Sequence, residues 1–324
     1  MTSKKKLLVC IPDFPFPARK NGISIRYFPI IEHLSADYDI HLLSIVNGSV
    51  SLELQHEALR FCSRLSIYMR CPLMVGVGRK IFSRLKSSVP GQIPFEFFRY
   101  DNSHIEHFIK GETKGVRYDA VIAVLVSYQA LIKKLVIADR YILDVIDSPY
   151  SVCSRKLARG FMARYDLWLT GLWERKALKS ADYAFYISPL DRLVGAGDCI
   201  DNSRVGVIPN GLFFDDHVHE KVPFRCRTVG YLGHMSYPPN IKAALRLYRI
   251  FNELYTEYDV QLVIIGRDPS AEILALASDP RVIVTGTVDN IWPYINGVDI
   301  FVFPMEIGSG QQNKLLEAMG AGSQ

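Results

Sequence analysis

The chain has 324 residues, of which 49% are hydrophobic and 22% are charged, and its formal net charge is +5. This composition is that of a globular protein, and the length suits two α/β domains better than one. The positive charge is modest and spread along the sequence, without an arginine-rich run or an aromatic-studded basic strand. We therefore expect no nucleic acid partner.

Apolar runs in this sequence are short. Leu7–Ile11 follows three lysines but ends at Pro12, which makes it shorter than the core of a signal peptide. The longest uninterrupted run, Ala120–Val126, is far below the length of a membrane span. The six cysteines form no close pair and no metal-ligand spacing. We therefore expect a cytoplasmic protein with free thiols and no bound metal.

The first two thirds of the sequence alternate short apolar runs with longer stretches of helical periodicity. This alternation is typical of a parallel sheet covered by helices on both faces. It predicts seven strands, at Leu7–Ile11, Ile40–Ile45, Leu65–Tyr68, Ala120–Val124, Tyr141–Val145, Tyr183–Ile187 and Val205–Ile208. It predicts four helices, at Ser24–Ser35, Leu52–Cys62, Ser103–Gly111 and Ser151–Ser180.

A second series of the same kind follows a polar stretch that contains Pro223. It predicts strands at Thr228–Leu232, Val260–Ile265, Val282–Thr285 and Ile300–Phe303, with helices at Ile241–Tyr255, Ala271–Ala277 and Ile291–Ile295. We therefore predict an N-terminal Rossmann-like domain over residues 1–211, a linker over 212–227, and a C-terminal Rossmann-like domain over 228–324.

Two features of the first domain lie where a ligand of an open α/β sheet would bind. Asn21 and Gly22 suit a turn with positive φ, and Gly22 would let backbone amides approach a ligand; a plain turn is the alternative. Asp147 follows a strand at its carboxyl end and is a candidate binding residue, with capping of the next helix as the alternative. Glu174, within the long helix, is expected to be a packed salt-bridge partner.

Residues 74–89 combine apolar side chains with Arg79, Lys80, Arg84 and Lys86. As a helix this stretch would be basic and amphipathic, which suits an anionic membrane surface. A solvated helix packed on the first domain is the alternative.

The end of the sequence is its most informative part. The strand at Ile300–Phe303 leads into a glycine-flanked turn, Gly308-Ser309-Gly310, and then into a segment of good helix formers. The free amides of such a helix start suit an anion. Lys314 and Glu317 stand three residues apart and share one helix face. A cation beside a carboxylate suits a diphosphate joined to a ribose, and an ordinary strand, turn and helix is the alternative.

Gly-Ser-Gly, then Lys314 and Leu-Glu-Ala-Met, resembles the nucleotide-sugar site of the group 1 glycosyltransferases, retaining enzymes of the GT-B fold. The resemblance is to a Gly-Ser-Gly/Lys-x-x-Glu-Ala-Met subgroup. It implies an α/β fold of two Rossmann-like, doubly wound domains. Only four of about six expected strands are visible in the second domain. We therefore expect that domain to be incomplete and the chain to be C-terminally truncated, covering about four fifths of such an enzyme.

The resemblance also implies roles for individual residues. Lys314 and Glu317 become the catalytic pair, the lysine neutralising the leaving diphosphate and the glutamate holding the ribose hydroxyls. Asp147 falls on the acceptor side. The implied donor-binding residues are Gly22, Arg26, His234, Gly266, Arg267, Thr287, Val288, Gly308, Ser309, Gly310, Gln312 and Asn313. Many relatives have Arg and Lys where this sequence has His234 and Asn240, and Glu in place of Ser309, so Lys314 is expected to be the principal cation.

The implied function is transfer of a sugar, of the hexosyltransferase type, from a nucleoside-diphosphate sugar to a glycan or glycolipid acceptor with retention. Such enzymes need no metal and no cofactor besides the sugar nucleotide, and they often work in polysaccharide biosynthesis at the inner face of the cytoplasmic membrane. Three alternatives remain: a GT-B sugar epimerase, a catalytically incomplete nucleotide-sugar-binding remnant, and a dinucleotide oxidoreductase. The last lacks the third glycine of its fingerprint.

Overall fold

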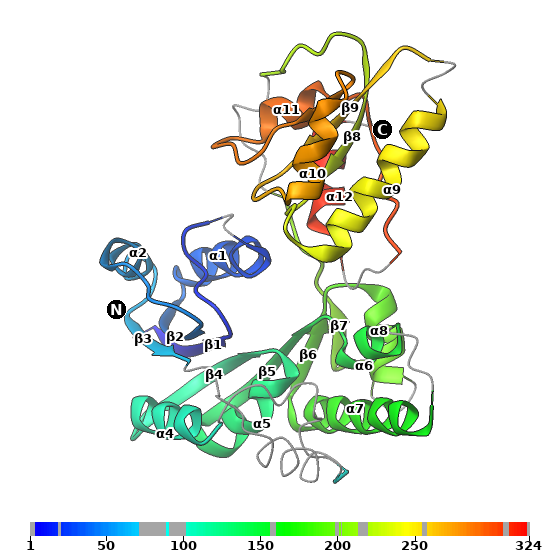
Figure 1. The fold of residues 1–324 in the computed structure, drawn as a ribbon. Helices are drawn as coiled ribbons and strands as arrows, with labels where there is room; N and C mark the ends of the chain where they lie inside the picture. Colours follow the sequence, from blue (N-terminus) through cyan, green and yellow to red (C-terminus); the bar gives the residue numbers. More distant parts are fainter. Residues whose placement is uncertain are drawn as a thin grey trace. The chain divides into compact units, whose positions relative to one another are not determined.

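The fold was obtained as a computed structural model. It describes residues 4–18, 21–70, 89–90, 102–155, 160–197, 201, 203–212, 220–254, 258–306 and 311–322. The chain divides into two compact units, Met1–Asn210 and Gly211–Gln324 (Figure 1). Each unit is an α/β structure built on one parallel sheet, which confirms the predicted fold class.

Unit 1 (Met1–Asn210) contains a seven-stranded sheet with the order β3-β2-β1-β4-β5-β6-β7. All seven predicted strands are present. Their bounds are β1 (Lys5–Ile11), β2 (Tyr38–Val46), β3 (Arg64–Met69), β4 (Arg117–Val124), β5 (Ile137–Ile146), β6 (Tyr183–Tyr186) and β7 (Val205–Val207).

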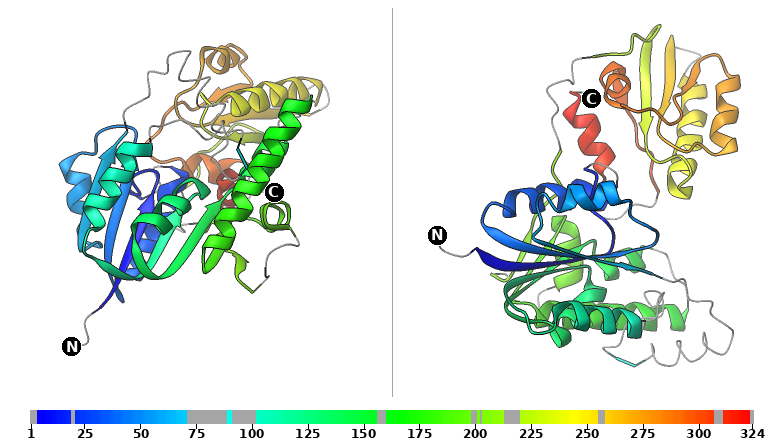
Figure 2. Two further views of the ribbon diagram at one scale, coloured as in Figure 1. Left: turned by 90° about the horizontal axis from the view of Figure 1, so that it is seen from below. Right: turned by 90° about the vertical axis from the view of Figure 1, so that its left-hand side faces the viewer.

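Helices cover both faces of this sheet, as the right-hand view of Figure 2 shows. The helices are α1 (Gly22–Leu34), α2 (Leu52–Ala58), α4 (Asn102–Thr113), α5 (Val126–Leu135), α6 (Pro149–Ser154), α7 (Phe161–Ser180) and α8 (Pro189–Ala196). Side chains of β1 alternate between two cores: Leu7, Val9 and Ile11 pack with α1 and α2, whereas Leu8 and Cys10 pack with α4 and α5.

The helix prediction for unit 1 was wrong in two respects. Helices α5 and α8 were not predicted, because their short apolar runs blend into those of the strands before them. The single helix predicted over Ser151–Ser180 is two helices, α6 and α7. The second of these begins after Gly160, whose φ of 109° is incompatible with a continuous helix.

Unit 2 (Gly211–Gln324) contains a four-stranded sheet with the order β10-β9-β8-β11. Its strands are β8 (Arg227–Leu232), β9 (Val260–Ile265), β10 (Val282–Val284) and β11 (Ile300–Phe301), the last shorter than predicted. Helices α9 (Pro238–Leu254) and α10 (Ala271–Ala275) pack on one face and α11 (Trp292–Gly297) and α12 (Asn313–Gly320) on the other. A short 3-10 helix, Leu276–Ser278, follows α10.

Each sheet has one place where the winding of the chain reverses. The order is third, second, first, fourth in both units, so the reversal lies between β1 and β4 in unit 1 and between β8 and β11 in unit 2. Connections on the two sides of such a point leave in opposite directions and open a crevice at the carboxyl ends of the strands. These two places are where ligands of doubly wound sheets bind.

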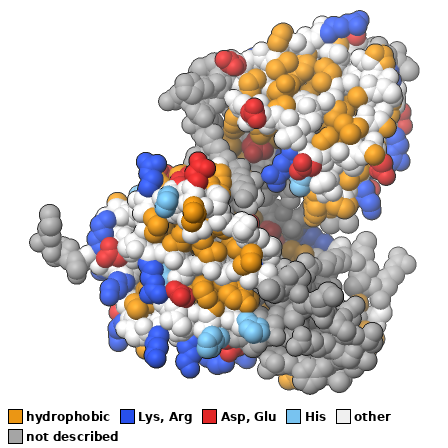
Figure 3. Space-filling model, turned by 60° about the vertical axis from the view of Figure 1, so that its left-hand side comes forward, with side chains coloured by type: hydrophobic (Ala, Val, Ile, Leu, Met, Phe, Trp, Pro, Cys, Tyr) orange, Lys and Arg blue, Asp and Glu red, His pale blue; other side chains and the backbone are white. Residues whose placement is uncertain are grey.

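Charged side chains are dispersed on one face of the molecule. On the face drawn in Figure 3, Lys and Arg side chains are interspersed with Asp and Glu and with hydrophobic side chains. No helix in the described part of the chain is long and apolar enough to cross a bilayer. Residues 74–88, the bulk of the predicted basic amphipathic stretch, lie outside the described residues.

Candidate functional site

The winding reversal of unit 2 brings together the end of β8, the start of α9 and the start of α12. Lys314 is the second residue of α12, yet only 8% of it is exposed. Its Nζ donates to Asn240 Oδ1 over 2.7 Å and to Tyr231 Oη over 3.2 Å, and lies 3.3 Å from Met305 Sδ. The ammonium also lies 5.1 Å from the ring centroid of Tyr231 and 5.7 Å from that of Phe303. Lys314 is therefore held in a pocket of neutral groups.

Burial has an electrostatic consequence for this lysine. Removal of the ammonium from water lowers the pKa of Lys314 to about 8. No carboxylate among the described residues forms an ion pair with it, so its charge is not balanced within the part of unit 2 that the structure describes. An uncompensated buried cation at a strand-end crevice suits an anionic ligand.

Glu317 lies one turn after Lys314 on α12 and is half-buried. Burial raises the pKa of its carboxyl group. No hydrogen-bond or ion-pair partner for this carboxylate occurs in the described part of the chain. The two residues of the predicted catalytic pair are therefore both placed at this end of the sheet with unused capacity, the cation for an anion and the carboxylate for hydroxyl donors.

The loop after β8 contributes His234. Its Nε2 lies 3.0 Å from Asp268 Oδ2 and 3.0 Å from Ser236 Oγ, and the side chain is 40% exposed. Arg267 is exposed and its Nε lies 3.9 Å from the same Asp268 carboxylate. Both basic groups stand on strand-end loops as predicted, but each is already associated with one carboxylate. Their role in donor binding stays a prediction.

Apart from Gly266, the remaining predicted donor residues of unit 2 divide into three groups. Thr287 Oγ1 accepts a hydrogen bond from Asp268 N over 3.1 Å, and Val288 next to it is half-buried. Gln312 and Asn313 form the start of α12, with Gln312 as N-cap residue without a side-chain cap bond. Gly308, Ser309 and Gly310 lie outside the described residues.

Gly266 fits its position because two strand-end loops touch there. Its φ is +154°, and a Cβ built on it would lie 1.7 Å from Gly233 O. We expect Gly266→Ala to lower the free energy of unfolding of unit 2 by about 2–4 kcal/mol, from backbone strain plus displacement of the β8–α9 loop. Urea unfolding followed by circular dichroism measures this. Gly286→Ala is the control: its φ is +67° but no atom lies within 4 Å, so about 1 kcal/mol is expected.

The predicted turn at Asn21 and Gly22 in unit 1 was wrong in its geometry. Asn21 is extended, with φ of −156°, and Gly22 opens helix α1 without a positive φ. The side chain of Asn21 caps this helix by accepting from Ser24 N over 2.9 Å, while Ser24 Oγ accepts from Asn21 N. Asparagine stands here because it caps a helix, and the approach of a ligand to Gly22 stays a prediction.

Arg26 is held inside unit 1. Its Nε and Nη2 donate to the two oxygens of Asp144 over 2.6 and 3.0 Å, and only 4% of the residue is exposed. Its Nη1 donates to Ile208 O over 2.8 Å and to Asn210 Oδ1 over 3.1 Å. Tyr27 Oη donates to Asp144 over 2.5 Å. Arg26 therefore ties α1 to the ends of β5 and β7, and its predicted contact with the donor remains untested.

Asp147 follows β5, where Ile146 has a φ of 63°. The alternative that Asp147 caps the next helix is wrong, because Ser148 is the N-cap of α6 and accepts from Ser151 N over 3.0 Å. Asp147 Oδ1 is buried and finds no hydrogen-bond partner in the described part of the chain. Burial, and next the charge of Asp191, raise the pKa of Asp147 to about 6, while Arg155 opposes this.

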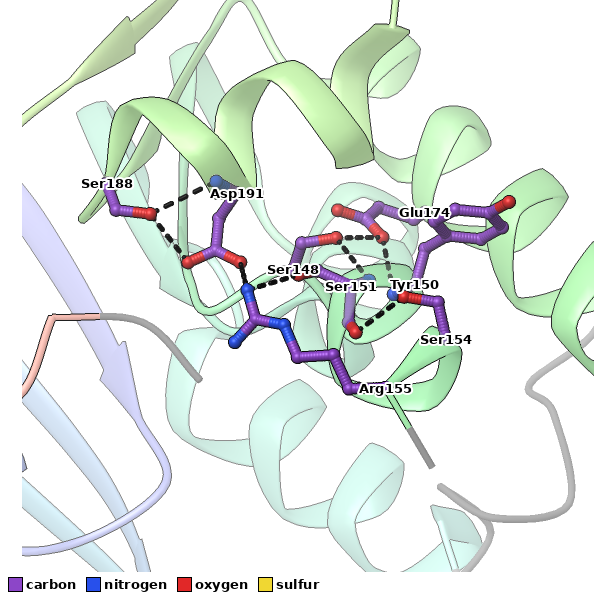
Figure 4. Close-up of polar contacts among 8 residues, drawn as sticks. All are labelled: Ser148, Tyr150, Ser151, Ser154, Arg155, Glu174, Ser188 and Asp191. Atoms are coloured by element: carbon purple, nitrogen blue, oxygen red, sulfur yellow. Dashed lines mark hydrogen bonds and ion pairs between the residues drawn. The ribbon is translucent and has the colours of Figure 1, made fainter. Parts of the chain in front are cut away.

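Figure 4 shows two further carboxylates, those of Glu174 and Asp191, in the same part of unit 1 as Ser148. Glu174 accepts from Ser148 Oγ, Tyr150 N and Tyr186 Oη over 3.0, 2.9 and 2.8 Å. It is thus fully buried among neutral donors, and its expected role as a salt-bridge partner was wrong. Asp191 is also fully buried; it accepts from Ser188 Oγ over 2.7 Å and lies 3.6 Å from Arg155 Nη2.

Sequence reasoning missed the residues that surround Lys314 and Asp147. Asn240 was noted only as a departure from relatives, and Tyr231, Met305 and Asp191 were not singled out. Tyr231 looked like a core aromatic of a strand, which it also is. The only signal in the sequence was the hydroxyl group of Tyr231, a hydrogen-bonding group at a position that the strand pattern assigns to the interior.

Three comparisons with known proteins bear on this chain. Residues 226–323 match a family model described as Glycosyl transferases group 1. A search of curated proteins found no match. Many solved structures match this chain.

One such structure is HepE from Anabaena in complex with UDP and glucose, at a TM-score of 0.57 and 12% identity, covering 98% of this chain and 79% of that one. Sucrose-phosphate synthase from Thermosynechococcus elongatus has a TM-score of 0.63 and 15% identity, covering 99% and 80%. The lipopolysaccharide outer core galactosyltransferase WaaB has a TM-score of 0.57 and 14% identity, covering 98% and 79%. The chain thus has the fold of these proteins, and its residues 226–323 match the group 1 glycosyltransferases.

Proposed function

We propose that this protein is a retaining glycosyltransferase of the group 1 type, which transfers a sugar from a nucleoside-diphosphate sugar to a glycan or glycolipid acceptor. The observation that carries the proposal is the buried ammonium of Lys314, without a carboxylate partner in the described residues, one helical turn from Glu317. The match of residues 226–323 to the family supports it. HepE, which has the same fold, was solved with UDP and glucose.

In this proposal unit 2 binds the donor. Lys314 and the amides at the start of α12 stabilise the charge that grows on the leaving diphosphate, and Glu317 accepts hydrogen bonds from the ribose hydroxyls. The other residues of unit 2 to which the proposal assigns a role in donor binding are His234, Gly266, Arg267, Thr287, Val288, Gly308, Ser309, Gly310, Gln312 and Asn313. Retention requires that the acceptor hydroxyl attack the anomeric carbon on the face from which the diphosphate leaves. A phosphate oxygen of the leaving diphosphate lies on that face and takes the proton of the hydroxyl, so no protein base is needed.

Unit 1 receives the acceptor in this proposal. Its β5 end carries Asp147 with one buried oxygen free of hydrogen bonds in the described part, which a hydroxyl of the acceptor would satisfy. We further propose that the enzyme works in polysaccharide biosynthesis at the inner face of the cytoplasmic membrane, held there by residues 74–89. Sedimentation with anionic liposomes tests this, with neutralisation of Arg79, Lys80, Arg84 and Lys86 as the matched comparison.

The function is tested by incubation with UDP-, GDP- and ADP-linked hexoses, with and without a mixture of lipid-linked and free glycans. Release of nucleoside diphosphate with formation of a glycoside that keeps the anomeric configuration of the donor, followed by nuclear magnetic resonance, supports the proposal. Conversion of the sugar without an acceptor would instead identify an epimerase. Nucleotide binding without turnover of any donor would identify a binding protein.

An Asp147→Asn variant is expected to be more stable than the wild type at pH 7 and to transfer sugar more slowly. The folded protein keeps the proton of Asp147 up to about pH 6, whereas an unfolded aspartate releases it near pH 4. The contribution of Asp147 to the free energy of unfolding of the wild type therefore decreases between pH 4 and 6. Above pH 6 this contribution stays about 1–2 kcal/mol lower than at pH 4, after allowance for solvent screening.

The measurement is urea unfolding of both proteins between pH 4 and 7, together with the transfer rate. Asp139→Asn, at an exposed ion pair with Arg117, is the control and should show no such gain. Unchanged transfer in Asp147→Asn would remove Asp147 from the acceptor site, and a stability difference independent of pH would contradict the raised pKa.

A further inference from the structure

The pocket around Lys314 contains three acceptors of unequal strength. The amide oxygen of Asn240 at 2.7 Å and the hydroxyl of Tyr231 at 3.2 Å are good acceptors, whereas the thioether of Met305 at 3.3 Å is a weak one. An ammonium group has three hydrogens to donate. Two of these hydrogens are thus donated to protein oxygens. Within the described part of unit 2, the third is donated to the sulfur atom of Met305, which a stronger acceptor can replace.

Asn240 has a fixed orientation in this pocket. Its Nδ2 donates to His234 O over 3.0 Å, which forces Oδ1 towards Lys314, and the same Oδ1 accepts from Tyr231 Oη over 3.1 Å. A Cβ on Gly233 would lie 2.8 Å from Asn240 Nδ2, so only glycine lets the loop approach the amide this closely. The β8–α9 loop therefore sets the place of the lysine nitrogen on α12.

Among the residues that the structure describes, no charged or titratable group on the neighbouring elements supplies a counter-charge to the ammonium. Glu317 lies one turn along α12, and burial is the cause of its raised pKa, with no contribution from Lys314. On the β8–α9 loop, His234 pairs with Asp268. From α9 and the segment after β11, Arg246 pairs with Glu306 at 2.9 Å. On β8 the neutral phenol of Tyr231 faces the lysine, and its burial raises its pKa.

We propose that Asn240 and Tyr231 are positioning residues that hold Lys314 as the cation of the donor site, through neutral acceptors only, so that the phosphate groups of the donor supply its counter-charge. The inference rests on the proposed function and adds to it the residues that place the cation. A carboxylate in the place of Asn240 would bind the lysine more strongly, but it would also neutralise it and repel a phosphate.

The neutral surroundings couple donor binding to proton uptake. In the free protein the pKa of Lys314 is about 8, so at pH 8 about half of the molecules carry a neutral lysine. A diphosphate beside the nitrogen favours the charged form and raises this pKa. Binding at pH 8 should therefore take up about half a proton, and affinity should fall as the pH rises above 8.

The test compares the wild type with Asn240→Asp by calorimetric titration of UDP, GDP and ADP at pH 8 in two buffers of different ionisation enthalpy. The terminal phosphate of these nucleotides titrates near pH 6 and does not interfere. We expect the wild type to take up protons, and Asn240→Asp to bind at least tenfold more weakly without proton uptake. Asn252→Asp, on the same helix where Asn252 accepts from Arg281, is the matched control and should behave as the wild type.

Equal affinity and equal proton uptake in Asn240→Asp and wild type would overturn the inference. Tyr231→Phe is a second variant, which keeps the packing of the ring. It should weaken binding by less than Asn240→Asp, because it removes one acceptor but adds no carboxylate that would neutralise Lys314 and repel a phosphate. If the wild type binds none of the three nucleotides, the proposed function fails. The positioning by Asn240 is then decided without ligand: the stability of the wild type should rise between pH 8 and 10, and Asn240→Asp should lack this rise because the introduced carboxylate keeps the lysine charged.

Discussion

A Lys314→Met variant is expected to bind a nucleoside diphosphate about tenfold to a hundredfold more weakly than the wild type. Methionine keeps the apolar stem of the side chain but removes the ammonium group that lies 2.7 Å from Asn240 Oδ1. A charge-assisted hydrogen bond contributes about 1.5–3 kcal/mol, which corresponds to this range of affinity. Calorimetric titration with UDP, GDP and ADP at pH 7 measures the change.

The control for this variant is Lys221→Met, which replaces an exposed lysine of the same unit and should leave affinity unchanged. Equal affinity of Lys314→Met and wild type would show that the ammonium does not meet the phosphates. The size of the loss of affinity also distinguishes a direct contact between the ammonium and the phosphates from long-range attraction, since a distant charge would contribute much less to affinity at physiological salt.

Stability distinguishes a binding role of Lys314 from a purely structural one. An unfolded lysine keeps its proton up to about pH 10, whereas folded Lys314 releases it near pH 8. Protonated Lys314 therefore opposes folding below pH 8, and wild-type stability should rise between pH 8 and 10. Lys314→Met lacks this rise and should be at least as stable as the wild type at pH 7. A variant that loses both binding and stability would instead identify Lys314 as a structural link.

The second large effect concerns unit 1. Asp144→Ala is expected to lower its free energy of unfolding by about 3–5 kcal/mol, because it leaves the guanidinium of Arg26 buried without its carboxylate. Arg26 and Asp144 are each only 4% exposed, and the pair joins α1 to β5 with a bidentate contact. Tyr27 Oη loses its acceptor as well. Urea unfolding at pH 7 measures the loss.

Asp139→Ala is the matched control, since Asp139 pairs with Arg117 at a position where both side chains are largely exposed. Such a pair contributes less than about 1 kcal/mol. A loss of under about 1 kcal/mol in Asp144→Ala would mean that water reaches Arg26 in unit 1. That outcome would return Arg26 to the set of residues available to a ligand.

The strands of both units followed from the sequence because a buried parallel strand is apolar on both faces. Leu262–Ile265 is such a run, and it lies in strand β9 (Val260–Ile265), which was predicted with these bounds. The helices were harder, since α5 starts within the apolar run that forms the end of β4. Periodicity does not divide a continuous apolar run into a strand and a helix.

Part of the candidate site could be predicted from the sequence, because it depends on residues that are close together along the chain. Lys314 and Glu317 are three residues apart, and this spacing alone places them on one face of a helix. The sequence also indicated that the helix follows a strand, and hence that it starts at the ligand-binding edge of a sheet. Both statements depend only on short-range geometry.

The partners of these residues depend on contacts between distant parts of the chain. Tyr231 and Asn240 meet Lys314 across 83 and 74 residues, and Asp144 meets Arg26 across 118. The periodicity of a sequence does not indicate such pairings. Arg26 was therefore interpreted as a ligand-binding cation, and Asn240 only as a departure from the residue found in relatives. The sequence by itself determined the strands, their order along the chain and the residues at the strand ends. The tertiary structure decided which of those residues are paired internally, because the order of strands in the sheet determines which loop ends meet.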